Sequence, residues 1–316
     1  MTAPRPKRPR AAGSAPLPLN DPLDAGASAG HPTLRPYLFP WRIFGAEPKL
    51  EPMLHSALIN VMVKAARRAG RSLKRDLGEI EHLQVSLKGP ANFVSLADKR
   101  AEEMLYDDLI KARPGYGFIG EEGGAREGAD KSHTWIVDPL DGTTNFLHGI
   151  PQFAISIALQ REGTLIAGVI YNPANDELYI AERGKGAFLN DQRIRVAGRR
   201  RLDECVIACS LPHIGRGDHE LSREEMTAIQ TKVAGLRRFG AASLDLAFVA
   251  AGRLDGYWER NLQQWDIAAG QIVVREAGGI VSGIAGDDDP LKTGNVICGN
   301  EFVHAELVKV LKPLGK

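Results

Sequence analysis

Apolar residues recur at helical spacing where the periodic part of the chain begins, near residue 50. The positions at this spacing are Leu54, Leu58, Val61, Met62 and Ala65. They predict an amphipathic helix that runs to about Asp76. Ser95, with Asp98 three residues later, forms a capping pattern that predicts a second helix, running to about Ala112.

Runs rich in β-branched and aromatic residues come next and predict strands. The predicted strands are 117–120, 134–138, 153–161, 165–171, 177–182 and 187–189. Turn residues at Asn172-Pro173 and Asn190-Asp191 favour antiparallel pairing in this region. Helical and strand patterns alternate again after Ser222. The sequence therefore predicts a mixed α/β protein whose sheets are covered by helices.

The first 48 residues lack such a pattern. They hold 10 of the 19 prolines, and the first ten residues include four basic side chains and no acidic one. Too little apolar surface is present here to offset the entropy lost on ordering. We therefore expect a disordered leader over residues 1–48 and a single domain over residues 49–316.

Charge and cysteine content narrow the class of protein. The 40 basic and 39 acidic side chains nearly cancel, so the overall charge implies no polyanionic partner. The three cysteines, Cys205, Cys209 and Cys298, are too few for a disulfide framework and favour a reducing compartment. No apolar run approaches the ~18 residues of a membrane span, and no signal-peptide pattern is present. We expect a cytoplasmic protein with no membrane partner.

Three short patterns match known motifs without their usual context. Residues 115–120 spell G-x-G-x-x-G but lead into a predicted strand. Residues 26–30 spell G-x-S-x-G with no strand before them and no helix after them. Cys205, Cys209 and His213 lack a fourth ligand at zinc-finger spacing. We interpret the two glycine patterns as chance matches and the cysteines as buried thiols.

The stretch 135–148 carries the clearest chemical signal. A predicted apolar strand ends in Asp138, and Asp141 three residues later can converge with it. Gly142 allows a ligand to approach the backbone, and Thr143 begins a predicted helix whose free amides would attract an anion. Carboxylates beside an anion site would repel a phosphate unless a cation lay between them. The pairing therefore implies a hard divalent cation with oxygen ligands, of which Mg²⁺ is the natural choice.

Further carboxylates lie at the ends of other predicted elements. Glu121 and Glu122 follow strand 117–120, and Asp266 begins a helix of small residues, where the amide dipoles favour negative charge. A purely structural interpretation makes Asp138 a turn residue, Asp266 a cap and the glutamates solvated. The coincidence of all of them with the ends of elements, where α/β sites lie, favours a functional site.

Two longer motifs together resemble the signatures of the inositol monophosphatase family. They are residues 135–148 (WIVDPLDGTTNFLH) and 265–279 (WDIAAGQIVVREAGG). The likeness extends from about Lys49 to Lys312 and is greatest to the bacterial inositol-1-monophosphatases. It implies that this domain is catalytic and folds as a layered αβαβα sandwich, commonly a homodimer. It also implies Mg²⁺-dependent hydrolysis of a phosphate monoester, with two or three ions per site, and a lithium-sensitive family.

The resemblance assigns roles residue by residue. Glu121, Asp138 and the Leu140 carbonyl would bind one metal ion, and Asp138, Asp141 and Asp266 would bind a second. The implied substrate contacts are Asp141, Gly142, Thr143, Gly240, Ala242 and Glu259. Glu121 and Thr143 would orient the attacking water, with Asp98 hydrogen-bonded to Thr143. Lys88 would lie in a mobile loop.

The implied reaction is attack on phosphorus by metal-activated water, without a covalent intermediate. Covalent routes lack their motifs, because no cysteine begins a C-x5-R pattern and Asp138 and Asp141 do not fit D-x-D-x-T. The implied substrate is inositol 1-phosphate, and Glu259 favours a small phosphorylated polyol. Histidinol phosphate, fructose 1,6-bisphosphate, NADP and 3′-phosphoadenosine 5′-phosphate stay open. Relatives on this fold hydrolyse these esters, and Ala241 and Arg260-Asn261 depart from the family pattern beside the alcohol pocket.

An alternative of another class is a regulatory module that binds nucleic acid or protein through the leader. Its support in the sequence is the basic cluster between Arg5 and Arg10. A cluster of this size is ordinarily part of a solvated tail, so we favour the enzyme.

Overall fold

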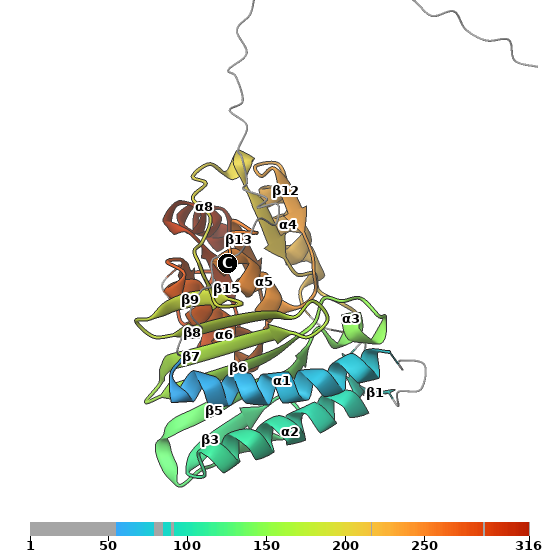
Figure 1. Ribbon diagram of the computed structural model, residues 1–316. Coiled ribbons are helices and arrows are strands. Elements are labelled where there is room, and N and C mark those ends of the chain that lie inside the picture. Colours follow the sequence, from blue (N-terminus) through green and yellow to red (C-terminus); the bar gives the residue numbers. More distant parts are fainter. Residues whose placement is uncertain (1–54, 79–84, 90–91, 216, 287, 316) are drawn as a thin grey trace, which may run out of the picture. The chain divides into compact units, whose positions relative to one another are not determined.

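The computed structural model describes residues 55–78, 85–89, 92–215, 217–286 and 288–315, and for 85–89 and 92–95 it describes the backbone alone (Figure 1). All of them belong to one compact unit, Glu51–Lys316. The predicted leader lies outside the described residues, and so does the side chain of Lys88.

The larger sheet has eight strands in the order β10-β9-β8-β7-β6-β5-β3-β4. The strands are β3 (Tyr116–Gly120), β4 (Gly124–Arg126), β5 (Asp130–Asp141), β6 (Ala154–Arg161), β7 (Thr164–Asn172), β8 (Glu177–Glu182), β9 (Gly186–Leu189) and β10 (Gln192–Ile194). From β5 to β10 all neighbours pair antiparallel, as predicted for the strands β6 to β9, and β3 pairs parallel to β5. Asn190 and Asp191 both take positive φ, 45° and 64°, as a tight hairpin turn between β9 and β10 requires.

The smaller sheet has five strands in the order β12-β11-β13-β15-β14. They are β11 (Val206–Cys209), β12 (Gly235–Arg237), β13 (Gly256–Glu259), β14 (Ile280–Ser282) and β15 (Val296–Gly299). β11 pairs parallel to β12 and β13, and β15 pairs antiparallel to β13 and β14. A separate hairpin joins β1 (Val85–Gly89) to β2 (Asn92–Ser95).

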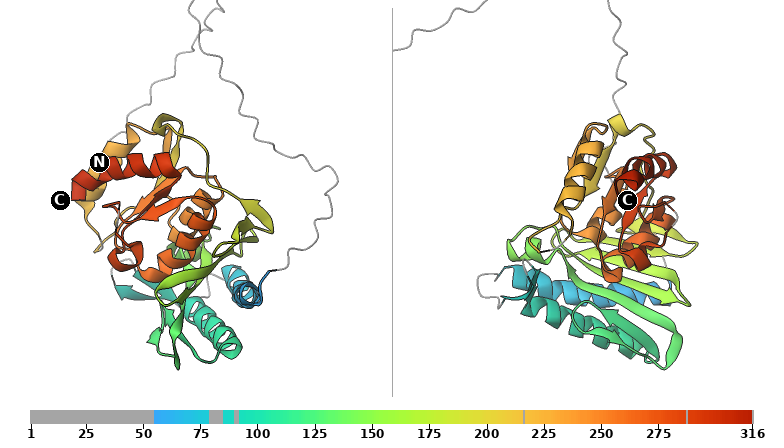
Figure 2. Two further views of the ribbon diagram at one scale, coloured as in Figure 1. Left: turned by 90° about the vertical axis from the view of Figure 1, so that its left-hand side faces the viewer. Right: turned by 180° about the vertical axis from the view of Figure 1, so that it is seen from behind.

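Helices cover both sheets and fill the space between them (Figures 1 and 2). The outer pair on the larger sheet is α1 (Ala57–Leu77) and α2 (Leu96–Ala112), close to the predicted bounds. α5 (Ala242–Ala250) and α6 (Gln264–Glu276) lie between the sheets. The outer face of the smaller sheet packs on α4 (His219–Gln230) and α8 (Glu301–Leu311). This order of layers confirms the predicted αβαβα sandwich.

Four shorter helices complete the described structure. They are α3 (Thr143–Leu147), α7 (Pro290–Thr293) and the 3₁₀ helices η2 (Leu202–Glu204) and η3 (Lys312–Gly315). No helix in the described part of the chain is long and apolar enough to cross a membrane.

Both faces of the larger sheet are buried, which explains the unbroken apolar run before Asp138. Trp135 and Val137 face the core beneath α1 and α2, whereas Ile136 faces the core with α5 and α6. Successive strand residues point to opposite faces, so a strand with two covered faces reads as continuous apolar sequence. Burial of this run fixes where β5 ends and thus where its carboxylates emerge.

Candidate active site

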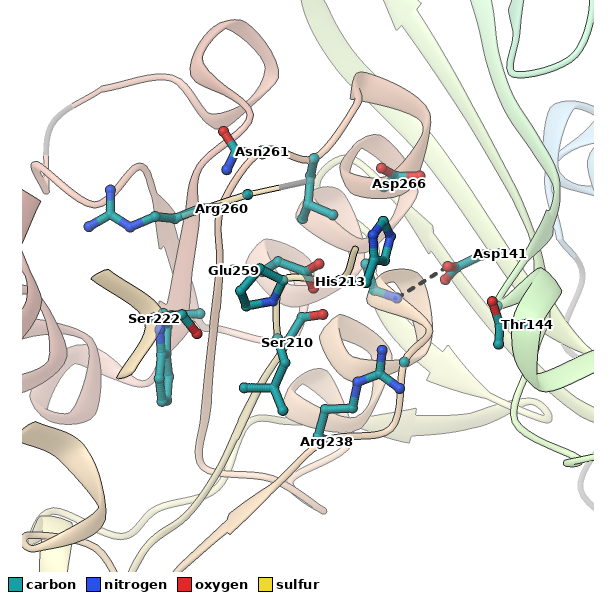
Figure 3. A pocket seen from close by; sticks show the side chains of 18 of the residues that line it. Asp141, Thr144, Ser210, His213, Ser222, Arg238, Glu259, Arg260, Asn261 and Asp266 are labelled. Atoms are coloured by element: carbon teal, nitrogen blue, oxygen red, sulfur yellow. Dashed lines mark hydrogen bonds between the residues drawn. The ribbon is translucent and has the colours of Figure 1, made fainter. Parts of the chain in front are cut away.

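The predicted site residues gather around one pocket of about 220 Å³. Ten of them line it: Glu121, Asp138, Leu140, Asp141, Gly142, Thr143, Gly240, Ala242, Glu259 and Asp266. They come from the ends of β3, β5 and β13 and from the first turns of α3, α5 and α6. Figure 3 shows Asp141 and Thr144 on one side of the pocket and Glu259 on the other. The remaining predicted residue, Asp98, contacts the site through Thr143.

The end of β5 differs from the prediction. The strand was expected to stop at Asp138, but it continues to Asp141 through an irregularity in its pairing with β6. Three steps along β5 match two along β6 there, which is the extra residue of a β-bulge. Pro139 explains the bulge, because proline has no amide hydrogen to donate to the ladder. Asp138 is buried, and its Oδ1 accepts a hydrogen bond from Leu140 N at 2.9 Å.

Gly142 and Thr143 form the corner between β5 and α3. Gly142 has φ of +88°, and a Cβ there would lie 2.8 Å from Gln152 O, so only glycine fits. α3 begins at Thr143, as expected. The Thr143 hydroxyl lies 3.1 Å from Asp98 Oδ1 and 3.0 Å from Leu140 O, so its proton is donated within the protein. Asp98 is 1% exposed and belongs to α2, so the outer helix layer contacts the site directly.

The carboxylates of the pocket are close enough to perturb one another. Burial, followed by the charges of Glu121, Asp141 and Asp266, raises the pKa of Asp138 well above its usual range. Burial raises the pKa of Asp141 to about 6, against the opposing effect of donors on Ser243. Burial and the charge of Asp141 raise the pKa of Asp266. Ionised carboxylates in such a place require a compensating cation.

The oxygen atoms of the pocket are of the kind that binds a hard divalent cation. In this structure two of the carboxylates accept hydrogen bonds from nearby backbone amides. Carboxylates and the Leu140 carbonyl are the oxygen ligands that Mg²⁺ prefers. Among the described residues, however, no three His, Cys, Asp or Glu side chains are grouped around one point. Asp138 and Asp266 instead accept from the backbone amides of Leu140 and Gln263, at 2.9 and 2.8 Å. Each of these bonds engages one of the two oxygens of its carboxylate.

Asn145 bonds to two segments that precede other elements of the fold. Its Nδ2 donates to Gln152 O and to Phe239 O, both at 2.8 Å. The second bond joins α3 to the loop that precedes α5. Gly240 in that loop has φ of +79°, which glycine adopts without strain.

The opposite wall of the pocket is formed by the end of β13. The buried Tyr257 hydroxyl donates a hydrogen bond to Glu259 Oε2. Arg260 is one of the departures from the family pattern, and its Nε donates to Glu225 Oε1 at 2.7 Å. Glu225 also accepts from Trp258 Nε1 at 3.1 Å. Arg260 and Glu225 thus form an ion pair in the pocket wall, and this pair holds the Arg260 guanidinium against α4.

Three residues without a predicted role, Asn145, Ser243 and Tyr257, bond to predicted residues or to the loop beside them. Asn145 lies inside the motif 135–148, although no role was assigned to it, and Tyr257 lies two residues before Glu259 in the sequence. Ser243 had one available signal, because the chain has alanine at residues 241 and 242 and a hydroxyl one position later.

The cysteines and His213 lie in different surroundings. Cys205 and Cys209 are buried in the core between the smaller sheet and α8, where burial raises the pKa of each thiol to about 12. His213 lines the pocket instead. The placement agrees with the interpretation of the cysteines as buried thiols.

Comparisons with known proteins agree with this geometry. The model of the inositol monophosphatase family matches residues 54–315. An inositol-1-monophosphatase from Mesorhizobium japonicum is 60% identical over 260 residues, covering 82% of this chain and 98% of that protein. A putative Nus factor SuhB from Neisseria meningitidis serogroup B is 44% identical over 253 residues, covering 80% and 97%. The crystal structure of an extragenic suppressor protein suhB from Bartonella henselae gives a TM-score of 0.80 at 57% identity, covering 81% and 99%.

Proposed function

The chain belongs to the inositol monophosphatase family, and from this membership we propose that it hydrolyses inositol 1-phosphate to myo-inositol and phosphate in the presence of Mg²⁺. The observation that carries the proposal is the convergence of Glu121, Asp138, Asp141 and Asp266 on one pocket beside the Thr143–Asp98 contact. The 60% identity to a protein named for this activity supports the choice of substrate. We propose further that the enzyme is a cytoplasmic homodimer.

The residues that would hold the ions are the carboxylates of the pocket and one carbonyl. They are Glu121, Asp138, the Leu140 carbonyl, Asp141 and Asp266, serving two or three Mg²⁺ ions. Bound Mg²⁺ would lower the pKa of a water molecule and neutralise charge on the phosphate and on the leaving oxygen. The amides of Gly142 and Thr143 would hold phosphate oxygens.

Thr143 is suited to orient the attacking water. A hydroxyl has one proton to donate and two lone pairs that accept. The proton is engaged by Asp98 Oδ1 or Leu140 O, so the lone pairs are directed to accept from a water molecule in the pocket. Glu121, which also lines the pocket, would supply a second acceptor. Two acceptors would turn a lone pair of the water toward phosphorus.

Substrate choice is tested by a panel of phosphate esters. Phosphate release is measured with inositol 1-phosphate, histidinol phosphate, fructose 1,6-bisphosphate, NADP and 3′-phosphoadenosine 5′-phosphate, each with Mg²⁺ and with excess EDTA. We expect the highest kcat/KM for inositol 1-phosphate, loss of turnover in EDTA and recovery when Mg²⁺ is restored. A higher kcat/KM for another ester would overturn the substrate, and turnover that survives EDTA would overturn the metal dependence.

A second candidate role is that of a Nus factor, which the 44% identity to a putative Nus factor SuhB favours. The test is complementation of a bacterial strain that lacks its SuhB, with the wild-type chain and with Asp138→Asn. Growth restored by both proteins would support a role independent of hydrolysis. Growth restored by the wild type alone would make hydrolysis the required activity.

A further inference from the structure

Asp141 accepts three hydrogen bonds from the first turn of α5. Ser243 donates to Oδ2 twice, from its backbone N at 2.7 Å and from its hydroxyl at 2.5 Å. Ala242 N donates to Oδ1 at 3.2 Å. Asp141 is 8% exposed and Ser243 is fully buried, so water does not compete for these bonds.

The three donors use the two oxygens of Asp141 unequally. Each carboxylate oxygen has two lone pairs that can accept. Both lone pairs of Oδ2 are engaged at short distance, whereas Oδ1 has one engaged by a longer bond. Oδ1 is therefore the oxygen of Asp141 with capacity for a ligand.

The hydroxyl is the part of this arrangement that depends on side-chain identity. Any residue except proline at positions 242 and 243 would supply the two amide donors. Ala241 and Ala242 carry no polar side chain, and in the part of the chain that the structure describes Ser243 is the side chain that donates to Asp141. The buried Ser243 hydroxyl thus determines which of the two Asp141 oxygens has capacity for a ligand.

We propose that Ser243 is a positioning residue whose hydroxyl occupies Asp141 Oδ2 and leaves Oδ1 to bind Mg²⁺. The proposal rests on the proposed function, because it takes Asp141 as a metal ligand.

The test measures Mg²⁺ binding to the full chain by isothermal titration calorimetry, without substrate. Ser243→Ala removes the hydroxyl and keeps both amide donors. Loss of a group that orients a metal ligand typically weakens metal affinity by about 10- to 100-fold, and we expect at least a tenfold weaker Kd for Mg²⁺. Because the lost interaction concerns the metal, kcat for inositol 1-phosphate should recover as Mg²⁺ is raised.

Two further variants serve as controls for Ser243→Ala. Ser282→Ala removes another buried hydroxyl, which donates to Gly283 O in the smaller sheet away from the pocket, and its Kd for Mg²⁺ should equal that of the wild type. Ser243→Cys keeps the size of the side chain and exchanges a strong donor for a weak one. It should weaken Mg²⁺ binding in the same direction, and it replaces Ser243→Ala if that protein does not fold.

The outcomes separate this proposal from the proposed function. A wild-type chain that binds Mg²⁺, with Ser243→Ala or Ser243→Cys within twofold of it, would overturn the role of Ser243 alone. A wild-type chain that binds no Mg²⁺ would overturn the proposed function and the role of Ser243 with it. Equal weakening by Ser243→Ala and Ser282→Ala would show a general effect of hydroxyl loss and would also overturn the proposal.

Discussion

Single residues of the pocket are oriented by hydrogen bonds to buried partners. Thr143 is held by Asp98 of α2, and Glu259 is held by Tyr257 of the same strand. A hydrogen bond to a charged group contributes about 1.5–3 kcal/mol to the stability of the arrangement in which it forms. The precision of the site therefore depends on groups that touch neither phosphate nor metal.

Tyr257→Phe tests this dependence on the alcohol side of the pocket. The change removes one buried hydroxyl and keeps the ring, so Glu259 loses the donor on Oε2. If Glu259 binds the alcohol equally in the ground state and the transition state, KM for inositol 1-phosphate should rise about tenfold while kcat stays within twofold.

Tyr179→Phe is the matched control for that measurement. Tyr179 is also fully buried, and its hydroxyl donates to Glu177 at 3.0 Å, outside the pocket. Steady-state kinetics should give a wild-type KM for this control. A wild-type KM for Tyr257→Phe as well would show that the hydroxyl does not position Glu259.

At this scale the sequence indicated the candidate metal ligands better than the residues that hydrogen-bond to them. Carboxylates at the ends of predicted elements were recognisable from local pattern, and the family resemblance supplied the pairing of Asp98 with Thr143. The bonds of Asn145 to Phe239 and of Ser243 to Asp141 join residues 94 and 102 positions apart. No local periodicity contains such pairs, so only the folded chain shows them.

Secondary-structure elements differ in how far the sequence predicted them. α1, α2 and the strands β6 to β9 have periodic patterns or flanking turn residues, and their bounds came within a few residues. The strands of the smaller sheet are three or four residues long, too short for a period to be read, and they were not assigned individually. The extension of β5 to Asp141 was missed because Pro139 normally ends a strand, whereas a bulge accommodates it here.

The helix α6, which carries Asp266 in its first turn, packs closely on β7. Gly168 of β7 makes this close packing possible, since a Cβ there would lie 2.5 Å from Ile272 Cγ2 and 2.9 Å from Ala269 O. Backbone atoms of α6 cannot move aside as a side chain can. We expect Gly168→Ala to lower the free energy of unfolding by about 1–3 kcal/mol. The displaced Asp266 should also raise the Mg²⁺ concentration needed for half-maximal activity.

The measurement is thermal unfolding combined with an Mg²⁺ titration of activity. Gly198→Ala serves as the control, because nothing lies within 4 Å of a Cβ at that position. Its free energy of unfolding should stay within about 0.5 kcal/mol of the wild type. A Gly168→Ala protein that melts with the control would show that α6 does not need this close approach.

The candidate site draws its carboxylates from both sheets and from the helices between them, and the outer helix α2 adds Asp98. The larger sheet contributes Asp138 and Asp141, the middle helices contribute Asp266 and the amides that hold Asp141, and the smaller sheet contributes Glu259. The layer order followed from the family resemblance rather than from hydrophobic pattern, which predicted only sheets covered by helices. The hydrophobic pattern of an element shows which of its faces are buried. It does not show which other element packs against each face.

Net charge taken over the whole chain conceals the property that matters for function. The nearly balanced total of 40 basic and 39 acidic side chains includes several acids concentrated in one pocket. Their burial and mutual repulsion raise the pKa values of Asp138 and Asp266. A divalent cation would relieve that repulsion and convert an acidic pocket into one that binds phosphate.

Asp138→Asn tests the central claim most directly. Asparagine keeps the shape and removes the charge that both proposed metal sites require. Because burial and neighbouring acids disfavour the ionised form of Asp138, the variant should melt no lower than the wild type without Mg²⁺.

The deciding measurement is kcat/KM for inositol 1-phosphate at saturating Mg²⁺ in the two proteins. We expect a loss on the order of 1,000-fold, equivalent to about 4 kcal/mol of transition-state stabilisation; unchanged turnover in a folded Asp138→Asn protein would contradict the proposed site.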